Sequence, residues 1–137
     1  MDALALANSF RDRHGRVEDA LDPALGLHRL RETVRGLFAA AATGSEPEAD
    51  AIAELNRLAR PPRLRWDEAG PSLAPEDAAA EVARTAIELL ASGRLRQCGN
   101  PRCILYFLAE GRRQFCSDTC ANRTRVARHA ARDQAGG

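Results

Sequence analysis

The sequence of 137 residues has few aromatic residues, no lysine and no long hydrophobic run. Phe, Trp and Tyr make up 4% of it, so we expect Leu, Val, Ile and Ala to form the core. No apolar run approaches the ~18 residues that span a bilayer, and residues 1–4 lack the basic flank of a secretory signal. A hydrophobic content of 45% excludes a wholly disordered chain. These features favour a soluble, cytoplasmic globular protein without a membrane partner.

The missing lysine is explained by codon usage. All 20 residues counted as Lys or Arg are Arg, and GC-rich codons favour Arg and Ala alike. The number of arginines therefore does not by itself indicate nucleic-acid binding. Their distribution is more informative, because residues 1–93 carry a net charge of −5 and residues 94–137 carry +6. This asymmetry predicts an anionic partner for the C-terminal part, or an electrostatic contact between the two parts.

All four cysteines lie in the basic part, at Cys98, Cys103, Cys116 and Cys120. Their pattern, C-x4-C-x12-C-x3-C, consists of two close pairs. In a cytosolic chain such pairs predict one structural zinc ion per chain, held by four thiolates with no position left for water. A disulfide framework and an iron–sulfur cluster are the alternatives. The absence of a signal sequence argues against the first, and the short paired spacing favours zinc over the second.

Residues 1–93 predict an α+β body that is mostly helical, with a small β-sheet or hairpin. Apolar residues at helical spacing predict three helices, at about 24–42, 48–59 and 75–92. Pro75, Glu76 and Asp77 suit the start of the third helix, and Gly93 is its expected C-terminal cap. In the second helix we expect three buried residues: Ile52, Leu55 and Leu58.

The rest of the body predicts turns and strands, and nothing in it indicates catalysis. Residues 3–10 fit a strand or a frayed helix, residues 11–16 a charged turn, and residues 63–73 a short hairpin. We expect Trp66 to be a core or hairpin residue and not a ligand platform. Residues 1–93 contain no nucleophile–base pair, phosphate-binding glycine loop or carboxylate metal motif. We therefore expect that the protein is not an enzyme.

Residues 94–137 predict a second module, a treble-clef-like zinc finger. In order we expect a knuckle, a strand, a turn and a returning strand, at 97–103, 104–108, 109–112 and 113–115. Ser117 is the expected N-cap of a last helix, and Asp118 suits its first turn, where backbone N–H groups would stabilise the Cys120 thiolate. A ββα finger is the alternative, but the cap at Ser117 favours the treble-clef-like arrangement. Because only residues 94–97 separate the third helix of the body from Cys98, we expect close docking of the two parts.

A helical wheel separates the arginines of the last helix. At ~100° per residue, Arg125, Arg128 and Arg132 share one exposed face, which we call the arginine stripe. Arg123 falls on the metal and core side, and we expect Asn122 and Arg123 to support the metal site. Five arginines are expected to contact DNA phosphates: Arg112, Arg113, Arg125, Arg128 and Arg132. A solvated face is the alternative, because exposed arginines are common on helices.

Two cysteine segments resemble the CGNR zinc finger of bacterial proteins. They are Cys98-Gly-Asn-Pro-Arg-Cys103 and Phe115-Cys-Ser-Asp-Thr-Cys-Ala-Asn-Arg123, with Val126-Ala-Arg-His-Ala130 after them. In that family the finger follows an α+β domain called ABATE, and the proteins are regarded as stress-induced transcription regulators. The body is similar to the ABATE pattern at 55–58, 62–66 and 87–93. The signature here has Ala121 in place of Gly, which a helix tolerates, and the body is shorter than is usual in the family.

Together these features predict a zinc-dependent DNA-binding regulator of transcription that meets DNA mainly through phosphates. Two other functions are open. One is a zinc-stapled module for protein–protein contact or dimerisation, and the other is a thiol-based redox sensor that releases zinc on oxidation. The basic charge favours DNA over protein–protein contact. A homodimer is compatible with the sequence, and no particular small-molecule effector of the body is indicated.

Overall fold

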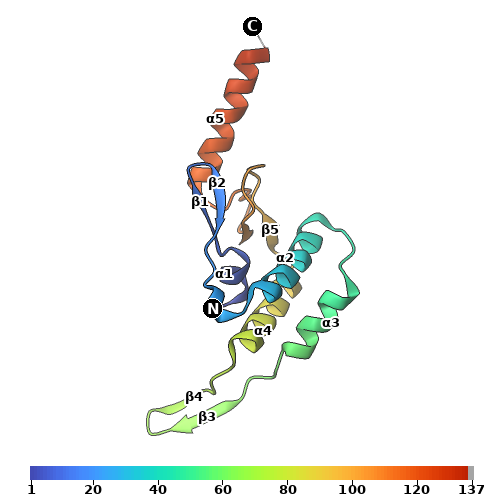
Figure 1. The fold of residues 1–137 in the computed structure, drawn as a ribbon, viewed down its shortest axis with the longest axis vertical. Coiled ribbons are helices and arrows are strands. Elements are labelled where there is room, and N and C mark those ends of the chain that lie inside the picture. The colour runs from blue at the N-terminus through green and yellow to red at the C-terminus, as the bar shows by residue number, and fades with distance from the viewer. Residues whose placement is uncertain (136–137) are drawn as a thin grey trace.

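The computed structural model describes residues 1–135 and shows an elongated molecule, with a helical body between two projections (Figure 1). One projection is the β3–β4 hairpin and the other is α5, which points away from the body. The elements are, in chain order, α1 (Ala3–Ala7), β1 (Phe10–Arg13), β2 (Arg16–Asp19), the 3-10 turn η1 (Pro23–Leu25), α2 (His28–Thr43), α3 (Ala49–Leu58), β3 (Leu64–Asp67), β4 (Gly70–Leu73), α4 (Ala78–Ala91), β5 (Leu95–Gln97), β6 (Tyr106–Leu108) and α5 (Asp118–Ala135). The last two residues of the predicted module 94–137 lie outside the described residues. Within residues 1–135 no helix is long and apolar enough to cross a bilayer.

Three two-stranded antiparallel sheets accompany the helices in the described part of the chain, which confirms the α+β class. β1 pairs with β2, and β3 pairs with β4, as two hairpins. β5 pairs with β6 across the cysteine knuckle, with Leu95 opposite Leu108 and Gln97 opposite Tyr106. The third sheet therefore links the end of the body to the cysteine-rich module.

The three long helices of the body form where the apolar spacing predicts them. The Asp77 carboxylate caps α4 by accepting a hydrogen bond from Ala80 N at 2.7 Å. Gly93 follows α4 with a φ of 68°, in the left-handed region that favours glycine. α2 begins at His28, later than expected, because the chain first makes the 3-10 turn that Gly26 closes with a φ of 65°.

The first part of the chain differs in part from its expected organisation. Residues 3–7 are a helix, one of the two alternatives for residues 3–10, whereas residues 11–16, expected as a charged turn, belong to a hairpin of two four-residue strands. Its turn is formed by His14 and Gly15, both with positive φ. Both faces of this hairpin are largely exposed, so charged residues fill its strands and no apolar alternation marks them in the sequence.

Two apolar side chains of the body are more exposed than expected. Ile52 of α3 is 43% exposed, whereas Leu55 of the same helix is 2% exposed and Leu58 is half-buried. The expectation for Ile52 is wrong because only one narrow side of α3 packs against α2 and α4. Trp66 lies in the β3–β4 hairpin, one of the two places predicted for it, and is 71% exposed.

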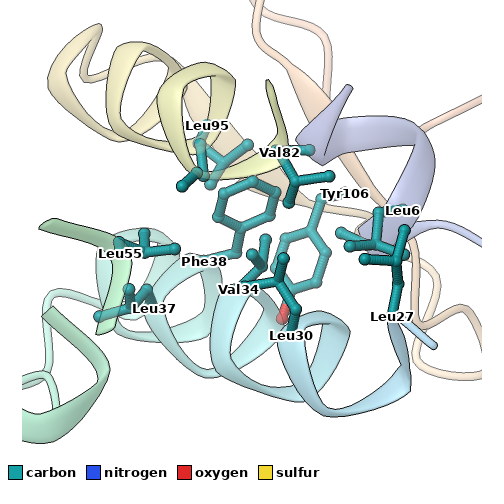
Figure 2. Close-up of a cluster of buried hydrophobic side chains, with 14 of the residues drawn as sticks. Leu6, Leu27, Leu30, Val34, Leu37, Phe38, Leu55, Val82, Leu95 and Tyr106 are labelled. Atoms are coloured by element: carbon teal, nitrogen blue, oxygen red, sulfur yellow. The ribbon is translucent and has the colours of Figure 1, made fainter. Parts of the chain in front are cut away.

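The core lies between α1, α2 and α4 and also takes residues from the C-terminal module (Figure 2). Phe38 and Val34 of α2 are fully buried at its centre. Leu95 of β5 and Tyr106 of β6 are buried in the same cluster. The rings of Phe38 and Tyr106 pack edge to face with centroids 5.5 Å apart. The body and the C-terminal module therefore share one hydrophobic core.

An ion pair between a buried arginine and an exposed aspartate attaches the β1–β2 hairpin to α2. Arg31 is buried, and its Nη1 and Nη2 donate to the two carboxylate oxygens of Asp19 at 2.7 and 2.6 Å. This bidentate bond holds the pKa of the Asp19 carboxyl well below its usual range. The Arg31 guanidinium also lies 4.2 Å from the centroid of the Phe10 ring. Because Phe10 and Asp19 are opposite each other at the base of the hairpin, both strands are anchored to α2.

The unequal burial of two residues on α3 gives a direct test of the fold. We expect Leu55→Ala to lower the free energy of unfolding by about 2–5 kcal/mol, because it leaves a cavity in the core. Ile52→Ala, on the exposed side, is the matched control and should cost less than about 1 kcal/mol. Urea denaturation followed by far-UV circular dichroism measures both values. Equal losses would contradict the placement of α3.

Candidate metal centre and basic helix

The four cysteine sulfurs converge on one point. All four Sγ atoms lie within 4.8 Å of one another, with 3.7 Å from Cys103 to Cys116 and 3.6 Å from Cys116 to Cys120. A tetrahedral zinc ion with Zn–S bonds of about 2.3 Å requires sulfurs about 3.8 Å apart. A disulfide requires about 2.05 Å, and all four thiols are free. The residues present therefore fit one structural Zn²⁺ with four thiolate ligands.

Backbone geometry around Gly99 brings the first cysteine pair toward the second. Gly99 N donates to the carbonyl of Gln114 at 2.7 Å, and a Cβ at residue 99 would lie 2.9 Å from that same oxygen. Only glycine allows this close approach. Beside it, Cys116 N lies 3.4 Å from Cys98 Sγ and donates to it. The two halves of the metal site are thus joined through backbone groups as well as through the ion.

Asn100 is the polar residue that organises the knuckle. It is buried, its carbonyl accepts from Cys103 N at 2.9 Å, and its side-chain Oδ1 accepts from Arg102 N at 3.1 Å. Together with the Cys116 side chain it lowers the pKa of the Cys120 thiol. Asn100 therefore acts on both cysteine pairs. The sequence analysis did not single it out, although its place between Gly99 and Pro101 in a tight turn was a usable signal.

The second cysteine pair lies at the start of α5, as predicted. Ser117 Oγ accepts from Cys120 N at 3.2 Å, which is the expected N-cap bond, and Asp118 lies in the first turn. Thr124 is buried one turn later, and its Oγ1 donates to the carbonyl of Cys120 at 2.9 Å. The order along the chain of knuckle, strand and ligands at the start of a helix is the one expected for a treble-clef-like finger.

The strand pairing of this module is different from the predicted one. Residues 104–108 were expected to pair with a returning strand at 113–115, but the strand Tyr106–Leu108 pairs with Leu95–Gln97. The pairing continues to the knuckle through Cys98 N, which donates to the carbonyl of Leu105 at 3.0 Å. The segment before the first cysteine is thus a strand of the module. Residues 113–115 form no strand, because their carbonyls bond Gly99 and the Arg113 side chain instead.

Two body residues hold the module in place, and the sequence analysis missed both. The Asn8 side chain donates to the carbonyl of Tyr106 and accepts from its N–H, both at 2.8 Å. Arg35 donates to the carbonyls of Ala7 at 2.6 Å and Ile104 at 2.8 Å. No local pattern in the sequence reveals that the partners of Arg35 are carbonyls of distant residues. The expected close docking of module and body is nevertheless what the structure has.

Burial of two of the cysteines makes the affinity for zinc depend on pH. Desolvation raises the pKa of the Cys103 and Cys116 thiols, that of Cys116 to about 11. Without metal these two thiols therefore keep their protons at neutral pH. Zinc binding must displace those protons, so the affinity for zinc falls as the pH is lowered.

The arginine stripe is exposed along α5, as the wheel predicts. Arg125, Arg128 and Arg132 are all exposed, and within residues 1–135 none of the three forms an ion pair. Asp133, the acidic residue in the last turns, lies 3.4 Å from His129 on another side of the helix. The stripe therefore keeps its full positive charge.

The two arginines of the preceding turn have different surroundings. Arg112 is exposed and lines a surface hollow of about 590 Å³ at the start of α5 together with Arg125. Arg113 lines it too, but its guanidinium donates to the carbonyls of Phe115 and Cys116 and lies 5.1 Å from the centroid of the Phe107 ring. The Arg113 guanidinium is thus bonded to carbonyls of its own module. The Arg112 side chain makes no such bond within residues 1–135.

Arg123 and Asn122 are exposed residues of α5 that line one groove together with Cys103, Cys116 and Cys120. Arg123 is exposed, and its Nη1 donates to Asp12 Oδ2 of the β1–β2 hairpin at 2.8 Å. That bond lowers the pKa of the Asp12 carboxyl. Asn122 is exposed on the same helix. The Arg123–Asp12 pair lies along a groove of about 1180 Å³ between this hairpin, the knuckle and α5. Arg123 therefore ties the helix to the body.

Two family models match the chain, one after the other. Residues 24–93 match ABATE, described as "Putative stress-induced transcription regulator". Residues 94–133 match the CGNR zinc finger. A search of curated proteins finds no match. The second match contains all four cysteines of the metal centre, and the first covers α2, α3 and α4 but not α1.

Metal analysis tests the assignment of the centre. Purified protein should contain about one equivalent of zinc, because four thiolates complete one tetrahedral shell. Cys98→Ser should lose most of it, since the remaining three thiolates leave the shell open. Zinc content measured by mass spectrometry of metals decides this. A folded protein free of metal, or one with the absorption of an iron–sulfur cluster, would contradict the assignment.

Two asparagines close to the cysteines in the sequence, Asn100 and Asn122, test which side chain supports the metal site. Asn100→Ala should weaken zinc binding by about 10- to 100-fold, the usual effect of removing a partner of a metal ligand. Asn122→Ala should leave the affinity unchanged, because its side chain is exposed on α5. Competition with a coloured chelator gives both affinities. If Asn122→Ala weakened zinc binding more than Asn100→Ala, then Asn122, the residue predicted from the sequence, would be the one that supports the metal site.

Proposed function

Because this chain belongs to the ABATE family and carries a CGNR zinc finger, we propose that it is a zinc-dependent DNA-binding regulator of transcription. The observation that carries the proposal is the arginine stripe on α5. This helix has 18 residues, about 27 Å of helix axis at 1.5 Å per residue. Figure 1 shows it projecting from the body, so a duplex can approach the stripe without meeting the rest of the molecule.

The charge of the metal-loaded module supports an anionic partner. Residues 94–137 carry +6, and four thiolates with one zinc dication reduce this to about +4. The body is acidic, with a net charge of −5 in residues 1–93. A duplex is therefore attracted to α5 and repelled by the body, which orients the protein on DNA.

Phosphates, and not bases, are the expected contacts. The arginine stripe contains no Asn or Gln that would read adenine in the major groove. Arg112 extends the stripe, because it shares the hollow at the start of α5 with Arg125. Arg113 contributes less, since its guanidinium already bonds two carbonyls. Arg123 has a positioning role through its bond to Asp12.

A non-enzymatic role in the cytoplasm goes with this proposal. Four protein thiolates leave zinc no coordination position for a water molecule, which hydrolytic zinc enzymes need. The four free cysteines fit a reducing compartment. Zinc then maintains the geometry of α5 and takes no part in chemistry.

The salt dependence of DNA binding tests the stripe. Each phosphate contact contributes about −0.9 to the slope of log K against log salt concentration, so three contacts contribute about −2.7. Replacing Arg125, Arg128 and Arg132 together by Gln should flatten the slope by up to this amount, with zinc content and helix content unchanged. Binding of random-sequence duplex at several salt concentrations measures it.

Two controls separate local contacts from net charge. The same three positions changed to Lys keep the charge and should keep most of the slope. Arg29→Gln with Arg57→Gln removes exposed charge from the body and should leave the slope unchanged. An unchanged slope in the Gln triple variant would remove the stripe as the DNA contact. A wild-type protein that binds no DNA would favour a zinc-stapled protein-interaction module.

A further inference from the structure

The β3–β4 hairpin has one apolar face that no part of the chain in residues 1–135 covers. Leu64 is opposite Leu73 and Trp66 is opposite Pro71, so these four side chains share a face, which we call the hairpin face. Leu64, Trp66 and Leu73 are 72%, 71% and 70% exposed. The other face is polar and carries an ion pair between Arg65 and Asp67 at 3.4 Å.

The position of the hairpin gives its apolar face no intramolecular partner. Figure 1 shows it projecting from the end of the body that is opposite to α5. Every residue from 60 to 73 except Gly70 is exposed. An isolated two-stranded hairpin is marginally stable in water, and contiguous exposed apolar side chains mark interaction sites. A partner that covers the hairpin face would stabilise the hairpin and would bury its exposed apolar side chains.

We propose that the hairpin face binds the same face of a second copy of this chain, forming a two-fold symmetric dimer. The charges along the hairpin make it complementary to itself. Its base carries Arg60 and Arg63 and its tip carries Glu68, whereas Asp67 is paired with Arg65 on the other face. When two hairpins stack face to face and antiparallel, the acidic tip of each copy lies over the basic base of the other.

The size of the hairpin face is sufficient for such a pair. A buried Trp removes about 150–250 Å² from water, and two Leu and one Pro bring each copy to roughly 500 Å². The two copies together reach about 1,000 Å², the lower limit of a specific interface. The dimer is therefore reversible and concentration-dependent, and it leaves both zinc modules free at its outer ends.

Trp66 provides a direct readout, because it is the only tryptophan in the chain. As the protein concentration rises, its fluorescence emission should move to shorter wavelength, since the indole leaves water. Sedimentation equilibrium should give a monomer–dimer transition over the same concentration range. Coincidence of the two curves places the interface at the hairpin. A monomer at every soluble concentration, or aggregation without a defined dimer, would overturn the proposal.

Leu73→Asp tests the apolar contact. It should raise the dissociation constant of the dimer by about 100-fold or more, because symmetry introduces the charge twice. Val126→Asp on α5 is the matched control, since Val126 is 68% exposed, and it should leave dimerisation unchanged. If the control had the larger effect, the dimer would form through the zinc module and the proposal would be wrong.

A charge exchange tests the antiparallel arrangement without altering the apolar residues. Glu68→Arg alone, and Arg60→Glu with Arg63→Glu, should each weaken the dimer by placing like charges together. The variant with all three changes should recover affinity. Failure to recover would exclude the antiparallel register. None of these measurements uses DNA, so their result is separate from that of the proposed function.

Discussion

The backbone of Tyr106 is the point at which the C-terminal module is joined to the body. The Asn8 side chain bonds both its N–H and its carbonyl, and so takes the place of a neighbouring strand at the edge of β6. The ring of Tyr106 packs against Phe38 in the core, and Arg35 bonds the carbonyl of Ile104 two residues earlier. The positions of the knuckle and of α5 relative to the body depend on this contact.

Zinc holds α5 in place, which the contact at Tyr106 alone does not do. The module has few apolar side chains, and α5 buries only Thr124 along its length, so a hydrophobic core does not hold the helix in place. The ion joins the knuckle to the first turn of α5, and the Arg123–Asp12 bond then ties that helix to the β1–β2 hairpin. Metal binding and helix orientation are therefore one event.

Features with a local signal could be predicted from the sequence, and features that depend on distant partners could not. The cysteine spacing, the Ser117 cap and the helices of the body each follow from residues close together in the chain. Asn8 and Arg35 bond carbonyls far away in the sequence, which no spacing reveals. The prediction of a returning strand at 113–115 was wrong for a related reason. Three-residue strands have too little pattern to choose a partner, and burial of Leu95 in the core decided in favour of β5.

The bond between Asn8 and Tyr106 joins residues 98 positions apart, and this separation affects how the chain folds during synthesis. α1 is synthesised well before its partner strand β6. Long-range contacts of this kind close slowly, because the intervening chain must be ordered first. The core therefore closes only after β6 has been synthesised. Because β6 lies between the two cysteine pairs, completion of the core also brings the segments that carry the metal ligands together.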